Sequence, residues 1–289
     1  MIQKLSLCAV VAVSTLGLAT GDAAAELTFG DDPIPEFAAL AAEEDITLEL
    51  LPEDGDDDVD QLLINGMVVS SKNFPGVLRM TTGGTCTAAL IGPATVLFAA
   101  HCLGNNVRIN FRAAGTTVRG ICQKAPGYNP TTHHQDWALC LLERPASGII
   151  FETVDVDTKP GSGERVMLSG FGCTFEDGPL DGRLRVGFSD VVNRPSGFRR
   201  EPSAIFTHSA ISAGEAVLCP GDSGGPLFRT GDAIDSARQI VGVNSRTTYS
   251  HGVSIFSATA SPEGAAFIRG WSEVNNQEIC GVNREIGCK

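Results

Sequence analysis

Three short segments of the sequence carry a histidine, an aspartate and a serine in settings that suit nucleophilic catalysis. His101 follows an apolar run, Asp136 precedes another, and Ser223 lies in a glycine-rich turn. A serine hydroxyl is a weak nucleophile at neutral pH, so it needs an imidazole that takes its proton and a buried carboxylate that fixes the imidazole tautomer. The sequence offers a candidate for each of these roles.

Glycine residues around the serine favour the same chemistry. Gly221 lies two residues before Ser223, where a side chain would tend to block the required backbone conformation and close approach. The backbone N–H groups of Gly221 and Ser223 can therefore point at a negative charge that develops on a carbonyl oxygen. A serine in a glycine-rich turn is by itself more often structural. The presence of His101 and Asp136 in order is what favours catalysis.

The elements that must position these residues are short apolar or alternating runs separated by Gly, Pro and Asn. The expected strands are 67–69, 76–80, 87–91, 95–99, 107–112, 116–122, 137–142, 165–169, 183–191, 239–243 and 252–256. Such spacing predicts an all-β sandwich or barrel. Ser261 and Pro262 then predict the start of a short C-terminal helix over 262–275, one face of which carries Phe267, Ile268, Trp271 and Val274.

The first 25 residues predict a secretory signal peptide. Lys4 precedes an apolar run, and the small residues at 23–25 suit cleavage. The run is too short and too interrupted to indicate a membrane span. Cys8 lies in this segment, so its removal leaves eight of the nine cysteines, an even number that favours disulfides in an exported chain.

Residues 26–63 differ sharply in composition from the rest of the chain. They hold 14 acidic side chains and no Lys or Arg, which predicts an acidic, largely unfolded propeptide. The whole chain has a net charge of -13, which would argue against nucleic acid or an anionic membrane as a partner if it were spread evenly, since phosphate binding needs clustered cations. Residues 64–289 hold 20 basic and 19 acidic groups, so the acidity belongs to the propeptide.

From Ile64 to about Asn275 the chain resembles the chymotrypsin/trypsin-like serine endopeptidases. The matching motifs, in the family's order, are Ile64-Asn65-Gly66 with Phe74-Pro75, Ala99-Ala100-His101-Cys102, 126–130 leading into 136–139, 169–172 and 221–226. The resemblance implies two antiparallel six-stranded β-barrels at about 64–155 and 156–260, within a protease domain of 64–289. His101 and Asp136 would come from the first barrel and Ser223 from the second.

In the mechanism that this resemblance implies, Ser223 attacks a peptide carbonyl and forms an acyl-enzyme. His101 acts as general base and then as general acid, while Asp136 orients His101. Gly221 and Ser223 supply the oxyanion hole. The partners expected are protein or peptide substrates, with no cofactor, and the protein is expected to be a secreted monomer, extracellular or periplasmic, with no membrane partner after signal removal.

A zinc site is the competing interpretation of the residues near Asp136. His133, His134 and Asp136 could bind a metal together with Cys122 or Cys140. Cysteine pairs in exported proteins are more often disulfides, and Asp136 already has a role. No metal site is therefore expected.

The acidic propeptide gains a role from the resemblance. Family members are made as inactive precursors in which a cut frees an Ile amino group that pairs with the Asp before the catalytic serine. Here those residues are Ile64 and Asp222, and an activating protease is an expected partner. Leu63 precedes Ile64 where the family has Arg or Lys, so the activating protease is not trypsin-like or the cut lies elsewhere.

The disulfide pairing is also partly implied by the resemblance. It pairs Cys86 with Cys102, which pins the histidine loop, and it places Cys122 and Cys140 on neighbouring strands. Four cysteines remain and allow three pairings. The preferred one joins Cys173 to Cys219 and Cys280 to Cys288.

The resemblance places the substrate pocket around Val217, which lies six residues before the candidate nucleophile. The other lining residues are Leu218, Ser245, Arg246, Thr247 and Gly252. With no carboxylate at the base, selection of Lys or Arg before the cut bond is not expected, and a small apolar pocket is favoured. Selection of acidic side chains through Arg246 and His251 is the alternative. A non-catalytic binding protein with a protease fold is the alternative from another class.

Overall fold

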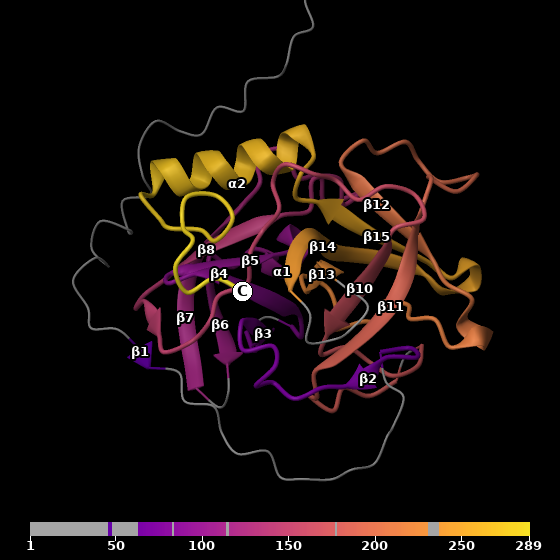
Figure 1. Cartoon of the computed structure of the whole chain (residues 1–289), viewed down its shortest axis with the longest axis horizontal. Helices are drawn as coiled ribbons and strands as arrows, with labels where there is room; N and C mark the ends of the chain where they lie inside the picture. Colours follow the sequence, from indigo (N-terminus) through magenta and orange to yellow (C-terminus); the bar gives the residue numbers. More distant parts are fainter. Residues whose placement is uncertain (1–45, 48–62, 83, 114–115, 177, 231–236) are drawn as a thin grey trace, which may run out of the picture.

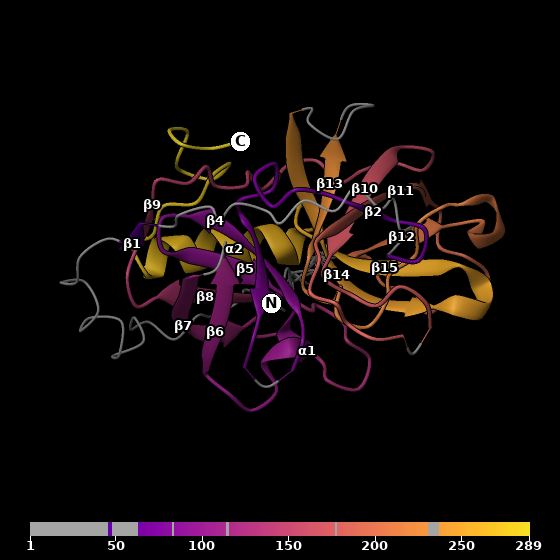
Figure 2. The same cartoon turned by 90° about the horizontal axis from the view of Figure 1, so that it is seen from below.

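The computed structural model describes residues 46–47, 63–82, 84–113, 116–176, 178–230 and 237–289. The expected signal peptide and nearly all of the acidic propeptide lie outside these residues and stay predictions. Two bodies of antiparallel strands lie side by side, and one helix near the C-terminus lies over the first of them (Figures 1 and 2).

The first body is a closed barrel in the order β3-β4-β5-β8-β7-β6. Its strands are β3 (Val77–Met80), β4 (Thr87–Gly92), β5 (Thr95–Phe98), β6 (Arg108–Ala113), β7 (Thr116–Lys124) and β8 (Ala138–Leu142). Strands β4, β5 and β8 are buried along their whole length, as expected where both faces of a strand are covered. A separate parallel pair joins β1 (Ile46–Thr47) to β9 (Ala146–Ser147).

The second body is a sheet in the order β10-β13-β14-β15-β12-β11-β2, and an additional β10–β11 pairing closes six of these strands into a ring. Its strands are β10 (Arg165–Gly170), β11 (Arg185–Val192), β12 (Ala204–His208), β13 (Pro226–Thr230), β14 (Arg238–Thr248) and β15 (Val253–Ala258). The expected all-β fold is confirmed.

Strand β2 (Met67–Val68) pairs outside the first barrel. It falls in the part assigned to the first barrel, yet it pairs with β11 of the second. The segment that follows Leu63 therefore runs along the second barrel before the chain enters the first.

Helix α2 (Pro262–Val274) covers the first barrel and has the expected start. The Ser261 side chain accepts a hydrogen bond from the Gly264 amide at 3.0 Å, and Pro262 is the first helical residue. Phe267, Ile268 and Trp271 are buried in the same core as the first barrel. Within the described part of the chain, neither α2 nor any other helix has the length and apolar character to cross a membrane.

Four disulfides tie the chain together. They join Cys86 to Cys102, Cys122 to Cys140, Cys173 to Cys219 and Cys280 to Cys288, the same four pairs that the sequence analysis preferred. The Cys122–Cys140 bridge crosses the paired strands β7 and β8. These two thiols are thus not available to a metal, which removes the zinc site that would have used them.

A buried ion pair joins the connection between the barrels to the second barrel. Arg238, at the start of β14, donates to both carboxylate oxygens of Glu152 at 2.9 and 2.6 Å and to the Asn73 carbonyl at 2.9 Å. Its guanidinium lies 4.1 Å from the ring centre of Phe74. Both charged side chains are fully buried, so water cannot solvate the charge of one if its partner is removed.

We expect Arg238→Ala to lower the free energy of unfolding by about 3–5 kcal/mol, because it leaves the Glu152 carboxylate buried without its partner. The matched control is Arg269→Ala, which breaks an exposed ion pair with Asp157 and should cost no more than about 1 kcal/mol. Urea unfolding of the precursor measures both. Equal losses in the two variants would contradict this account of the Glu152–Arg238 pair.

Candidate active site

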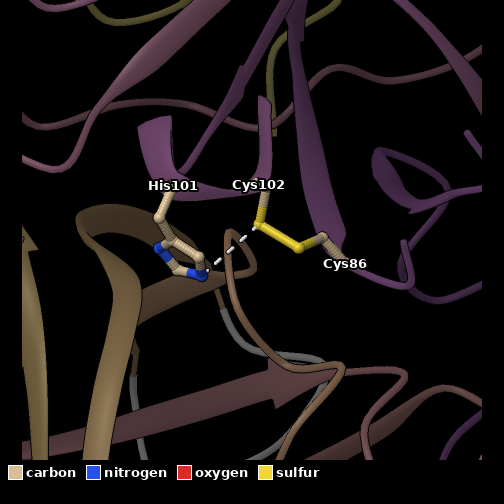
Figure 3. A group of neighbouring side chains, drawn as sticks. All are labelled: Cys86, His101 and Cys102. Atoms are coloured by element: carbon tan, nitrogen blue, oxygen red, sulfur yellow. Dashed lines mark hydrogen bonds between the residues drawn. A yellow bond between two sulfur atoms is a disulfide. The ribbon is translucent and has the colours of Figure 1, made fainter. Parts of the chain in front are cut away.

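His101 lies in α1 (Ala100–Leu103), a single helical turn just after β5. The Cys86–Cys102 disulfide ties this turn to the residue before β4, and Figure 3 shows the imidazole beside it. Cys102 Sγ is 3.7 Å from His101 Nε2 and also 3.7 Å from the Ser223 carbonyl oxygen. The Nε2 edge of the imidazole therefore faces the loop that carries Ser223.

Asp136 is fully buried and accepts three hydrogen bonds. Its Oδ1 accepts from the His101 amide at 2.8 Å, and its Oδ2 lies 2.7 Å from His101 Nδ1. The Ser245 hydroxyl donates to the same Oδ2 at 2.6 Å. Because a carboxylate can only accept, the His101 proton is held on Nδ1, and the Nε2 lone pair is left to act as a base.

The second barrel holds Asp136 in place. The Asp136 amide donates to the Ser257 hydroxyl at 3.2 Å, and the Trp137 indole donates to the Ser257 carbonyl at 3.1 Å. Ser245 and Ser257 lie on β14 and β15, so this carboxylate of the first barrel depends on both of these strands. The sequence analysis placed Ser245 in the substrate pocket and missed Ser257, since a serine within a strand carries no local signal.

Ser223 is partly exposed, in the loop that precedes β13. Its carbonyl accepts from the Thr87 amide at 2.8 Å, which ties the loop to β4. Gly224 has a φ of +83°, and a Cβ there would lie 3.1 Å from the Ala99 amide nitrogen. The loop that carries Ser223 and precedes β13, called the nucleophile loop below, is thus packed against the backbone just before His101.

Gly221 adopts a backbone conformation that favours glycine, as the sequence analysis expected. Its φ is +101°, and a Cβ would lie 2.8 Å from the Cα of Gly172. Thr87 Oγ1 donates to the Gly221 carbonyl at 2.8 Å and accepts from the Phe171 amide at 3.0 Å. Thr87 therefore fixes this turn, and the sequence analysis did not find it.

Asp222 is a buried carboxylate whose hydrogen-bond donors are neutral. Its Oδ1 accepts from the Gly172 amide and its Oδ2 from the Cys219 amide, each at 2.8 Å. Burial raises the pKa of Asp222 to about 7, because these two amides and the charge of Arg185 offset the desolvation only in part. The site would favour a cation at this carboxylate.

This raised pKa predicts the pH dependence of precursor stability. The folded-state pKa of Asp222 is about 7 and the unfolded value is about 3.9, so its contribution is complete below about pH 4 and is lost as the pH rises to about 7. The loss amounts to about 4 kcal/mol. We expect urea unfolding at pH 4.5 and pH 8 to show it, and Asp222→Asn to remove most of the difference. An Asn variant with the same pH dependence would contradict the assignment.

The two residues expected to pair on activation, Ile64 and Asp222, both contact the short segment 217–219. Ile64 is partly exposed, and its carbonyl accepts from the Val217 amide at 3.2 Å. Asp222 lies beyond Val217 and Cys219 in the chain. The structure thus places both residues against the same short segment of the second barrel.

The expected pocket residues separate into two groups. Val217, Leu218, Ser245 and Gly252 are buried, and the Leu218 amide donates to the Ser254 hydroxyl at 3.1 Å. Arg246 and Thr247 instead line an open cavity of about 470 Å³, whose other lining residues include His133, Phe198 and Glu201.

Arg246 and His133 connect this cavity to His101. Arg246 forms an ion pair with Glu201 and donates to the His133 carbonyl at 2.8 Å. The His133 ring stacks on His101 with 5.0 Å between ring centres and 22° between planes. Burial lowers the pKa of His133, because desolvation disfavours the charged ring. His133 has a φ of +52°.

Sequence comparisons agree with this geometry. The Trypsin family model matches residues 63–260, which span both barrels and contain His101, Asp136 and Ser223. The chain belongs to the trypsin family. The expected resemblance to the chymotrypsin/trypsin-like serine proteases is therefore confirmed.

Several relatives in the trypsin family match part of the chain. Serine protease 56 of Mus musculus is 28% identical over 189 residues, covering 57% of this chain and 31% of the relative. Trypsin eta of Drosophila erecta is 30% identical over 162 residues, covering 50% and 63%. Serine protease SP24D of Anopheles gambiae is 26% identical over 224 residues, covering 71% and 76%. The matched segment thus spans about a third of Serine protease 56.

Proposed function

We propose that this chain is a secreted serine endopeptidase that cleaves peptide bonds through Ser223, His101 and Asp136. The observation that carries the proposal is the hydrogen-bonded Asp136–His101 pair, with the Nε2 edge of the imidazole facing the Ser223 loop. Membership of the trypsin family supports the same reaction.

The geometry supports a specific role for each group. His101 Nε2 takes the proton of the Ser223 hydroxyl as the oxygen attacks the substrate carbonyl, and then delivers this proton to the leaving amine. The buried Asp136 carboxylate stabilises the imidazolium that forms in between. Water then hydrolyses the acyl-enzyme on Ser223 by the same transfers in reverse order.

The oxyanion hole is assigned to the amides of Gly221 and Ser223. The turn at Gly221 and the tie from Thr87 to its carbonyl hold the peptide units of this loop in a fixed orientation. Donors that are already oriented stabilise the developing negative charge without reorganising during the reaction.

The protein is proposed to be made as an inactive precursor that an activating protease cuts. Removal of the acidic propeptide frees an α-amino group, which the resemblance assigns to Ile64, and its ammonium pairs with Asp222. The raised pKa of Asp222 supports this role, since the buried carboxylate lacks a full counter-charge in the uncut chain. Because Asp222 and Ser223 are adjacent, a charge placed there orders the nucleophile loop.

An apolar side chain before the cut bond is the proposed preference. Val217 and Leu218 are apolar, and no carboxylate stands at either position to select a Lys or Arg side chain. The acidic alternative through Arg246 has less support, because Glu201 already neutralises that guanidinium. His251 lies exposed, next to Ser250.

Hydrolysis of a peptide library by the processed protein tests this proposal. The expected result is cleavage after apolar residues, with Ser223→Ala as the inactive control. A binding protein with a protease fold is the competing result, and correctly processed protein that cleaves no library member would establish it. Cleavage mainly after Asp or Glu would move the preference to Arg246 and His251.

A further inference from the structure

We propose that the second barrel carries a binding site for an acidic stretch of the substrate protein, on the side that holds the residues before the cut bond. The site consists of two adjoining cavities, called the basic groove below, whose free cations are Lys159, Arg194, Arg199 and Arg200. Its role rests on the proposed protease function, to which it adds a substrate class: proteins with Asp and Glu residues ahead of an apolar cleavage position.

The basic groove begins beside His101. The His133 ring stacks on His101 and lines the first cavity, of about 470 Å³. A second cavity of about 460 Å³ adjoins the first, because Glu201 and Phe206 line both. A cavity of this volume is about 10 Å across, so the two together accommodate about six residues of an extended chain at about 3.3 Å per residue. A peptide bound at the active site can therefore reach both cavities.

The first cavity lies on the side assigned to residues before the cut bond. Arg246 and Thr247, which the resemblance places in the substrate pocket, both line it. They lie on β14 directly after Ser245, whose hydroxyl donates to Asp136. A substrate that runs along this strand therefore places the residues ahead of its cut bond in the basic groove.

The cations of the groove lack negative partners. Of the described residues that line the two cavities, Glu201 alone is acidic, and its carboxylate forms an ion pair with Arg246. None of the four other cations forms an ion pair with a carboxylate in the described part of the chain. Residues 64–289 hold nearly equal numbers of basic and acidic groups, so this excess is local. A cleft lined by one sign of charge attracts groups of the opposite sign.

The loop between β11 and β12, residues 193–203, carries the three arginines and is anchored to the barrel (Figure 1). The Phe198 ring packs on Phe206 of β12 with 6.1 Å between ring centres. Arg194 donates to the Phe198 carbonyl across the loop. The cations are thus presented by a folded loop whose backbone is held from both sides.

Lys159 approaches the same loop from the segment that joins the two barrels. Its Nζ donates to the Pro202 carbonyl at 3.0 Å and to the Ala204 carbonyl at 2.5 Å. Burial lowers the pKa of Lys159, and the charge of Glu263 offsets this only in part. An anion bound in the second cavity would stabilise the ammonium.

An acidic peptide fits the basic groove better than a small anion does. The cations are divided between the two cavities, so one small anion would meet only some of them. Apolar and hydroxyl side chains lie between the cations, and those of the first cavity include Phe198, Ile255 and Thr248. A polypeptide with several carboxylates can use both kinds of surface at once.

Three fluorogenic peptides with the same apolar residue and cut bond test the site. One has a neutral tail of Gly and Ser, one has Asp and Glu over about six residues before the cut bond, and one has the same acidic tail after it. The processed protein is assayed for kcat and KM with each peptide, at low salt and in about 1 M NaCl, where the Debye length is about 3 Å.

At low salt the acidic tail before the cut bond should raise kcat/KM about 10-fold over the neutral tail, the combined effect of several exposed ion pairs. The gain should appear mainly in KM, because these contacts lie away from the reacting atoms. High salt should remove it. In a variant with Arg194→Ala, Arg199→Ala and Arg200→Ala, the ratio of the acidic to the neutral peptide should fall to within about 2-fold of one.

The matched control carries Arg108→Ala, Arg112→Ala and Arg119→Ala, which remove the same charge from exposed arginines on β6 and β7 of the first barrel. It should keep the wild-type ratio. No gain for the acidic tail, an equal gain for both acidic tails, or a gain that survives in the groove variant would overturn the site, while cleavage of the neutral peptide would leave the protease function intact.

Heparin provides a further comparison, because a sulfated polysaccharide is the other polyanion that such cations could hold. Heparin that binds the wild-type protein but not the groove variant, with no gain for the acidic peptide, would assign the groove to a polysaccharide and overturn the proposal. If none of the three peptides is cleaved, the proposed function fails and the substrate site fails with it.

Discussion

Replacement of Ser223 by alanine in the processed protein should lower the turnover of peptide hydrolysis by about 10⁶-fold, the scale of removing the nucleophile from a triad. The hydroxyl is the group that the Asp136–His101 pair is arranged to activate, and its loop is tied to β4 through the Thr87 amide. Alanine removes one oxygen and leaves the fold unchanged. Single-turnover assays with an activated ester and with peptides measure the loss.

A double variant separates a triad from three independent residues. Because the nucleophile and its base act as a unit, His101→Ala added to Ser223→Ala should cause little further loss. Hydrolysis close to the wild-type rate in Ser223→Ala would contradict the assignment of the nucleophile. Additive losses in the double variant would contradict the assignment of His101 as its base.

Replacement of Asp136 by asparagine should lower turnover by about 10⁴-fold, the effect that loss of this carboxylate has in serine-protease triads. The buried carboxylate accepts from both the His101 amide and His101 Nδ1. An asparagine amide that faces Nδ1 would donate to it, so the imidazole proton moves to Nε2. His101 then cannot accept the proton of Ser223. Measurement of kcat with a peptide substrate shows the loss.

Ser245→Ala is the matched control for this change. It removes one hydrogen bond to the same Asp136 oxygen but leaves the charge and the His101 tautomer intact. A hydrogen bond to a charged group contributes about 1.5–3 kcal/mol, so the loss should stay within about 10–200-fold. An Asp136→Asn variant no slower than Ser245→Ala would show that the carboxylate does not control the tautomer.

The residues of the proposed triad could be picked out as candidates from the sequence because each lies in a motif whose residue types are required locally. Gly221 and Gly224 have φ values of +101° and +83°, which explains why glycines mark the turn around Ser223. His101 directly follows a strand and precedes a cysteine that forms a disulfide. These local requirements can be recognised from the types of a few consecutive residues.

The residues that hold these groups in place could not be found in this way. Thr87 and Ser257 lie far in sequence from the residues that they hold, Gly221 and Asp136, and each acts only after the barrels have closed and packed together. A buried threonine or serine on a strand looks like any other strand residue. Their hydrogen bonds to the site are tertiary contacts, which cannot be predicted from a local sequence pattern.

Strands β12 and β13 were also missed, for a related reason. Each has only five residues, β12 closely follows Pro202, and β13 begins at Pro226 directly after the glycine-rich turn. Turn signals therefore dominate both segments. Their strand conformation comes from pairing with β15 and with β10 and β14, which lie elsewhere in the sequence.

At the start of the trypsin-like domain, too, the sequence motif does not determine which residues are buried. The motif Ile64-Asn65-Gly66 marks the region but does not fix which neighbouring residue is buried. The structure shows that Leu63 is fully buried and Ile64 partly exposed. Burial, which depends on the packing of β10 and β11, is what separates two adjacent apolar residues that the sequence makes look equivalent.

Labelling of the processed protein with a fluorophosphonate tests the central claim most directly, because this reagent reacts with a serine only when a base activates it. We expect one phosphonyl group per molecule, located on Ser223 by peptide mapping, with peptide hydrolysis lost in proportion to labelling. His101→Ala should remain unlabelled. Peptide hydrolysis that survives complete labelling of Ser223, or correctly processed protein that takes up no label, would contradict the account.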